Sequence, residues 1–236
     1  MSIPNIKPME TIFRGSTFND NQGGIFRGRR RPSDPSDIDK ETTWNLTEDF
    51  NADTIDTSQW GSSAAGNSTI TITDGVLKIF TTDDNDTAYF YGIKKYSLVT
   101  NTQITFIAKI KQTSHADADC QYVIGLDGSL ATFANDAAEW LSLTTDTNPD
   151  SVFKWTTKDG TATQTAGTLV SGTWYELKIV LTAAKAEYWK NGILVHTNVV
   201  NIPDDIGLFP YFRVKNSDAA NNDYQLEIDS VRIKVI

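Results

Sequence analysis

Short runs of alternating apolar and polar residues recur along most of this chain, and they restrict its fold more than any other feature. Apolar side chains take every second position in residues 104–110, 175–181 and 231–235. A period of two with one apolar face is typical of antiparallel strands that pack on one side. No stretch shows a sustained helical period, so the sequence predicts an all-β protein.

Turn signals separate these runs. Asn191-Gly192 lies between residues 186–190 and 193–197, and both turn residues tolerate a positive φ, which predicts a two-residue hairpin. Many short strands without helices predict a two-sheet antiparallel β-sandwich. Further breaks are expected at four places: Asp74-Gly75, Asp127-Gly128, Asp159-Gly160 and Ser171-Gly172.

The first 44 residues differ from the rest. Residues 1–44 have no apolar period and contain Pro32 and Pro35, so we expect an extended N-terminal arm, followed by one domain over residues 45–236. Residues 1–31 have a net charge of +4 and the remainder −13. The arm is therefore predicted to attach to an acidic surface of another protein or of a second copy. The expected assembly contacts are Phe13, Arg14, Phe26, Arg27, Arg29, Arg30 and Arg31.

Composition excludes several classes of protein. An acidic body argues against nucleic acid as a partner. The single cysteine, Cys120, excludes an internal disulfide. The sequence contains no apolar run of 18 residues, so no membrane-spanning helix is predicted, and the N-terminus lacks the pattern of a signal peptide. We therefore expect a protein made in a cytoplasm that reaches the outside of a cell inside a released particle.

Four short motifs follow one another in residues 45–236. They are an acidic-Phe-Asn segment with a downstream Trp (48–60), a Gly-x-Leu strand (74–79), a Trp-Tyr strand with its Asn-Gly hairpin (172–192) and a terminal strand (227–233). In this order they resemble the concanavalin A-like lectin and glucanase domains, a laminin-G-like jelly roll. The resemblance implies two curved antiparallel sheets and a concave face that can hold a sugar chain.

The resemblance also allows a test for catalysis. Glucanases of this type carry an E-x-D-x-(x)-E pattern on one strand, so that one carboxylate acts as nucleophile and the other as acid. The strand expected there, residues 139–143, holds Glu139 alone, and the E-x-D of Glu227 and Asp229 lies in the terminal strand. His115 and His196 have no partners at zinc-ligand spacing. These observations predict a protein that is not an enzyme.

Three aromatic residues are candidates for glycan contact: Trp140, Trp155 and Tyr211. Trp140 and Trp155 lie on predicted central strands that would cross the concave face, although most tryptophans of sandwiches belong to the core. The resemblance further implies a structural calcium ion at Asp229, and the alternative is a carboxylate that caps a turn. No other cofactor is expected.

From these features we interpret the chain as a non-enzymatic structural component of a phage particle, such as a head-decoration, fibre or tail protein. It would be located in the virion, attached to other virion proteins or to copies of itself by the arm, and would display a lectin-like jelly roll able to bind surface glycans. No membrane partner is expected. Two alternatives remain open: an extracellular carbohydrate-binding module and a glycoside hydrolase.

Overall fold

The computed structural model describes residues 44–52, 54–83, 85–113, 120–129, 140–145, 153–159, 161–167, 169–216 and 223–236. In this part of the chain every regular element is a β-strand, and all strand pairs are antiparallel. The described residues contain no helix with the length and hydropathy needed to cross a bilayer. The predicted arm lies almost wholly outside them, so the proposed boundary near residue 44 stays a prediction.

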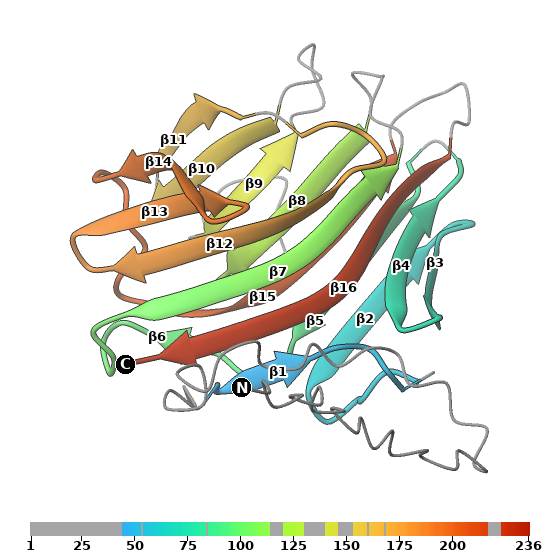
Figure 1. Ribbon diagram of the computed structural model, residues 1–236, viewed down its shortest axis with the longest axis horizontal. Helices are drawn as coiled ribbons and strands as arrows, with labels where there is room; N and C mark the ends of the chain where they lie inside the picture. Colours follow the sequence, from blue (N-terminus) through green and yellow to red (C-terminus); the bar gives the residue numbers. More distant parts are fainter. Residues whose placement is uncertain are drawn as a thin grey trace, which may run out of the picture. The chain divides into compact units, whose positions relative to one another are not determined.

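The strands form two sheets (Figure 1). Sheet I has the order β14 (Ile193–Asn198), β13 (Lys185–Lys190), β12 (Trp174–Thr182), β7 (Ile104–Thr113), β16 (Tyr224–Val235), β4 (Val76–Thr81) and β3 (Thr69–Thr73), with β1 (Leu46–Glu48) paired to β16. Sheet II has the order β11 (Thr161–Ala166), β10 (Phe153–Asp159), β9 (Trp140–Thr145), β8 (Cys120–Asp127), β15 (Gly207–Asn216), β5 (Thr87–Gly92) and β2 (Trp60–Ala65), with β6 (Tyr96–Ser97) paired to β15.

The hydrophobic core lies between the two sheets. Alternate residues of β4 and β12 are buried, as the period of two predicts. Their apolar side chains join one cluster with inward-facing residues of sheet II such as Phe90 and Phe212. This packing confirms the predicted all-β sandwich with a concanavalin A-like jelly roll.

Two predicted turns have the backbone conformation that their sequences require. Asn191 and Gly192 have φ values of 50° and 78°, and they connect β13 to β14. Asp74 and Gly75 have φ values of 56° and 70° between β3 and β4. Positive φ at both central residues matches the right-handed twist of the flanking strands, so these dipeptides determine the hairpin register.

The last strand contains a bulge. The pairing of β16 with β7 shifts between Ile228 and Ser230, so Asp229 is the extra residue. Regular alternation without the bulge would continue from Leu226 and Ile228 to Ser230 and Arg232, and would turn Val231 and Ile233 away from the core. The bulge restores the inward direction, and all four apolar side chains are buried.

Candidate functional site

The outer face of sheet II carries an unusual set of buried side chains. Cys120, Tyr122, Ile124 and Leu126 of β8 belong to the core between the sheets. The alternate residues of β8, which end with Asp127, therefore belong to the outer face. By the same alternation β15 buries Leu208, Phe212 and Val214 in the core and places Phe209, Tyr211 and Arg213 on the outer face.

Strand pairing brings these outward residues together. Phe209 of β15 lies opposite Asp127 of β8, Tyr211 lies opposite Tyr91 of β5, and Arg213 lies opposite Tyr89 of β5. Residues that face each other in an antiparallel pair have Cβ atoms about 4.5–5.5 Å apart. We call the set Tyr89, Tyr91, Asp127, Phe209, Tyr211 and Arg213 the sheet II cluster.

Aromatic rings line one side of this cluster. The ring centroids of Tyr89 and Tyr211 lie 6.2 Å apart in a stacked arrangement. Those of Tyr91 and Phe209 lie 6.1 Å apart, and those of Phe209 and Tyr211 lie 6.3 Å apart. Tyr211 and Phe209 are each 2% exposed, so both rings are shielded from water.

Asp127 is the carboxyl group of the cluster, and it is 0% exposed. Its Oδ1 accepts a hydrogen bond from the backbone N–H of Ser129 at 2.9 Å, whereas its buried Oδ2 has no hydrogen-bond partner. Burial raises the pKa of Asp127 to about 7, against the lowering effect of the N–H groups of Ser129 and Gly128 and the charges of Lys95 and Arg213. At neutral pH about half of the Asp127 carboxyl groups are therefore protonated.

Arg213 is the cation of the cluster, and it is 8% exposed. Its buried Nε has no hydrogen-bond partner. Burial lowers the pKa of Arg213, while Tyr211, Tyr89 and Asp127 act in the opposite direction. Burial also raises the pKa of Tyr211 well above its usual value, so this phenol stays neutral.

A third polar atom without a partner lies on the neighbouring strand. Ser142 of β9 is buried between Gly125 of β8 and Thr156 of β10, and its Oγ forms no hydrogen bond. Gly125 contributes no side chain to the space between Ser142 and Tyr211. Buried polar atoms are normally paired, so the three atoms on this face remain able to bind a water molecule or a ligand.

A pocket of about 530 Å³ is lined by Gly128 and Ser129, which follow Asp127, and by Phe209, which lies opposite Asp127 in the sheet. Lys95 lines this pocket and connects two of its other residues. Its Nζ donates a hydrogen bond to the Gly128 carbonyl at 2.9 Å and lies 5.4 Å from the Phe209 ring centroid. The volume is typical of small-molecule sites. The pocket is lined by Tyr91, Gly92, Ile93, Lys95, Gly128, Ser129 and Phe209.

The three predicted glycan-contact residues lie in different places. Tyr211 belongs to the sheet II cluster. Trp140 is the first residue of β9, and its backbone pairs with that of Asp127, but its side chain is outside the described part. The prediction for Trp155 is wrong, because Trp155 is 3% exposed in the core, with its ring centroid 5.4 Å from that of Tyr188. The register of β10 turns Phe153 and Trp155 inward.

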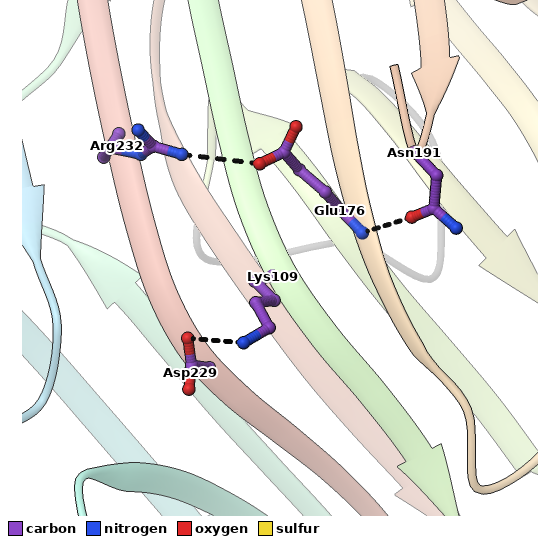
Figure 2. A network of polar contacts seen from close by, with 5 residues as sticks. All are labelled: Lys109, Glu176, Asn191, Asp229 and Arg232. Carbon is purple, nitrogen blue, oxygen red and sulfur yellow. Dashed lines mark hydrogen bonds and ion pairs between the residues drawn. The ribbon is translucent and has the colours of Figure 1, made fainter. Parts of the chain in front are cut away.

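The calcium site expected at Asp229 does not fit the structure. Asp229 lies on the outer face of sheet I, where Lys109 Nζ is 3.2 Å from its Oδ2 (Figure 2). Nearby, Arg232 is 3.5 Å from Glu176, whose N–H donates to Asn191 Oδ1 at 2.8 Å. A carboxylate already paired with a lysine disfavours a second cation, and no group of three or more His, Cys, Asp or Glu in the described residues could hold a metal ion.

The predicted assembly contacts lie outside the described residues. These are Phe13, Arg14, Phe26, Arg27, Arg29, Arg30 and Arg31.

The sequence analysis missed Asp127 and Arg213 as site residues. Asp127 was assigned to an Asp-Gly turn, where a carboxylate is ordinary. A usable signal exists for Arg213, because it interrupts the apolar run of residues 208–214. A charged residue in a buried strand is rare without a partner.

Comparisons with known proteins identify the family and the fold of this chain. The model of the SO2946-like, C-terminal domain family matches residues 74–198. A comparison with curated proteins finds no match.

Solved structures with the same fold include a β-1,3-glucanase from Mycobacterium marinum (13% identity, TM-score 0.63, covering 83% of this chain and 100% of that chain). A β-glucanase from Bacillus licheniformis is 12% identical with a TM-score of 0.63, over 82% and 99% of the two chains. A β-1,3-1,4-glucanase from a mouse hindgut metagenome is 12% identical with a TM-score of 0.62, over 81% and 99%.

These neighbours correct the functional interpretation drawn from the sequence. The chain was expected to be a non-enzymatic virion component, and the structures that share its fold are glycoside hydrolases. No finding supports a phage context. The comparisons favour the alternative of a glycoside hydrolase over that interpretation.

Proposed function

Because the chain belongs to the SO2946-like C-terminal domain family and has the fold of β-glucanases, we propose that it is a glycoside hydrolase with its active site on the outer face of sheet II. The observation that carries this proposal is the buried Asp127 carboxyl group, whose Oδ2 has no hydrogen-bond partner and whose neighbours Gly128 and Phe209 line a pocket. A carboxyl group in that setting can transfer a proton to a sugar oxygen.

In the proposed reaction Asp127 is the general acid. The proton on Oδ2 passes to the glycosidic oxygen while the bond between this oxygen and C1 of the sugar breaks. The oxygen of a water molecule forms the new bond to C1, and the proton released by this water restores the carboxyl group. A pKa near 7 suits both directions of proton transfer at neutral pH.

The pocket and its aromatic walls support the binding of a sugar ring. Tyr91 and Phe209 line this pocket. Aromatic faces bury a large apolar area, and the polar groups at their edges orient a ligand. A sugar ring bound in this pocket would contact Gly128 and Ser129, the residues that follow the proposed proton donor.

This site differs from the paired carboxylates that the resemblance implies. Ser142 of β9 carries a hydroxyl on the strand where that pattern was expected. Among the outward residues described in sheet II, Asp127 on the adjacent strand β8 is the one carboxyl group. The proposal therefore assigns the acid role to β8 and not to β9.

The first test is hydrolysis with a variant of the acid. The full chain is incubated with β-1,3-glucan and β-1,3-1,4-glucan, the substrates in the names of its structural neighbours, and new reducing ends are measured. Asp127→Asn should lower kcat/KM by about 10²–10⁴-fold, the usual contribution of a general acid. Asp229→Asn, which removes a carboxylate from the opposite sheet, should leave the rate unchanged.

The pH profile provides a second readout. Since the acid must be protonated, the activity of the parent should fall as the pH rises through about 7. Turnover by Asp127→Asn at the parental rate would remove Asp127 from the reaction. Binding of these glucans and of acidic polysaccharides without any turnover would contradict the hydrolase proposal itself.

A further inference from the structure

We infer that the substrate carries a carboxylated sugar, and that Arg213 of the sheet II cluster binds its carboxylate. This inference rests on the proposed function, because it takes the outer face of sheet II as the surface that holds the polysaccharide. It adds the chemical class of the substrate, which neither the family nor the fold specifies.

Arg213 occupies a buried position in the middle of sheet II. Arg213 lies in β15, between Val123 of β8 and Tyr89 of β5, near the middle of sheet II. Its side chain is more than nine-tenths buried. No residue in the described strands and turns forms a hydrogen bond or an ion pair with it, and its buried Nε has no hydrogen-bond partner.

The described groups around Arg213 provide little negative charge. The groups that act on it electrostatically are the phenols of Tyr211 and Tyr89 and the carboxyl of Asp127. The Tyr211 phenol is neutral, and the Asp127 carboxyl is about half protonated at pH 7. Within the described residues the buried guanidinium thus lacks a full counter-charge, and desolvation of a cation is strongly unfavourable without one.

Two cations on the outer face of sheet I, Lys109 and Arg232, provide a comparison, because each of them forms an ion pair within the protein. On sheet I, Lys109 pairs with Asp229 of the neighbouring strand, and Arg232 pairs with Glu176 across the intervening strand β7 (Figure 2). These cations are partly exposed and form ion pairs, whereas Arg213 is buried and has no ion pair with any described residue. The difference is expected where the counter-charge arrives with a ligand.

The geometry of the group selects the kind of anion. Guanidinium groups bind planar carboxylates through two parallel N–H···O hydrogen bonds. The stacked rings of Tyr89 and Tyr211 lie beside Arg213, and the proposed proton donor belongs to the same cluster. An anion bound here is therefore carried on a sugar ring, and a uronic acid has the required carboxylate. A sulfate ester on a sugar is the competing source of charge.

The test uses a matched pair of ligands and a variant that does not turn them over. Asp127→Asn of the full chain is titrated calorimetrically with a hexasaccharide of β-1,4-linked glucuronic acid and with the β-1,4-linked glucose hexasaccharide. The two differ by the carboxylates alone. We expect the acidic hexasaccharide to bind at least about tenfold more tightly, with an affinity that falls as salt is added.

Variants of Arg213 identify the residue responsible. Adding Arg213→Met to Asp127→Asn should abolish the preference, and Arg213→Lys should retain part of it, because lysine keeps the charge without the planar fork. Arg232→Met, on the opposite sheet, should leave the preference unchanged. Thermal unfolding of each variant establishes whether it is folded. If Arg213→Met does not fold, the affinity of Arg213→Lys for the two hexasaccharides decides whether Arg213 recognises the carboxylate.

Three results overturn the inference. Equal affinity for the two hexasaccharides, or an acidic preference that survives Arg213→Met, removes Arg213 from recognition. Tighter binding of a sulfated glucose hexasaccharide than of the glucuronic acid hexasaccharide makes the carboxylate assignment wrong. The proposed function is tested separately by reducing ends: turnover of neutral glucans without acidic preference defeats this inference alone, and acidic preference without turnover defeats hydrolysis alone.

Discussion

The two outer faces of the sandwich use charged residues in opposite ways. On sheet I, Lys109 and Asp229 form an exposed pair, which contributes about 0–1 kcal/mol to stability. On sheet II, Asp127 and Arg213 are buried, and each keeps an atom without a hydrogen-bond partner. Such groups reduce stability and persist where they act on a ligand, and strongly perturbed carboxyl groups cluster at functional sites.

Asp127 makes the stability of the protein depend on pH. The folded state raises the pKa of its carboxyl from 3.8 to about 7, so the folded state favours the protonated form. The contribution of Asp127 to stability should therefore be greatest below pH 4, fall as the pH rises to about 7, and stay level above it. A shift of about three pKa units corresponds to about 4 kcal/mol of unfolding free energy.

Asp127→Asn removes this titration. Its unfolding free energy should exceed that of the parent at pH 8, and the difference should shrink as the pH falls to 4. Denaturant titrations at both pH values measure it, with Asp229→Asn as the control carboxylate. An equal difference at the two pH values would show that the Asp127 carboxyl is not held protonated by burial.

At the scale of single elements, the hairpin turns determine the register of the strands that they join, and therefore which residues share a face. The β13–β14 hairpin turns at Asn191 and Gly192, both with positive φ. Asn191 also anchors the turn to β12, since its N–H donates to the Glu176 carbonyl at 2.8 Å and its Oδ1 accepts from the Glu176 N–H at 2.8 Å. Backbone conformation and side-chain hydrogen bonds thus support the same register.

Gly192→Ala should reduce the unfolding free energy by about 1 kcal/mol, because alanine in the left-handed region costs about 1–2 kcal/mol. A Cβ at Gly192 would meet nothing within 4 Å, so the loss comes from the backbone alone. Gly192→Asn should lose less, since asparagine tolerates this conformation. Denaturant unfolding of both variants provides the comparison, and equal losses would contradict the backbone explanation.

Trp155 tests the register of β10. Because its ring packs against Tyr188 in the core, Trp155→Ala should reduce the unfolding free energy by about 3–5 kcal/mol. Trp155→Phe should lose less and should leave glycan binding unchanged. A stable Trp155→Ala variant with weakened glycan binding would instead place this side chain on the outer face.

At the scale of the molecule, one core supports the sandwich. Its buried cluster draws its described members from residues 46–233, and both sheets contribute large side chains such as Tyr122, Phe106 and Phe212. A core that spans the sequence in this way requires long-range strand pairing, as between β1 and β16.

Removal of residues 1–43 should leave the unfolding free energy of the sandwich within about 0.5 kcal/mol of the full chain, a change typical of positions outside a core. The prediction follows because the residues of the described core begin at Leu46. Cooperative unfolding of the truncated chain at the parental midpoint is the expected result. A clearly lower midpoint would show that the first 43 residues contribute to the fold.

The sequence by itself determined the class of fold, because the period of two and the Asn-Gly and Asp-Gly turns act over a few neighbouring residues. It also showed that the paired carboxylates of the glucanases are missing from residues 139–143. The break in alternation between Ile228 and Val231 was visible too, and the structure explains it as the bulge at Asp229.

Tertiary structure alone decided which face each residue takes and which residues meet. Trp155 and Tyr211 are both aromatic residues of strands, but register turns the first into the core and the second to the outer face. Asp127 and Arg213 come from strands far apart in the sequence, and the pairing of β8 with β15 brings them to one cluster. A side chain's burial and pKa depend on such long-range neighbours, so local sequence pattern does not contain them.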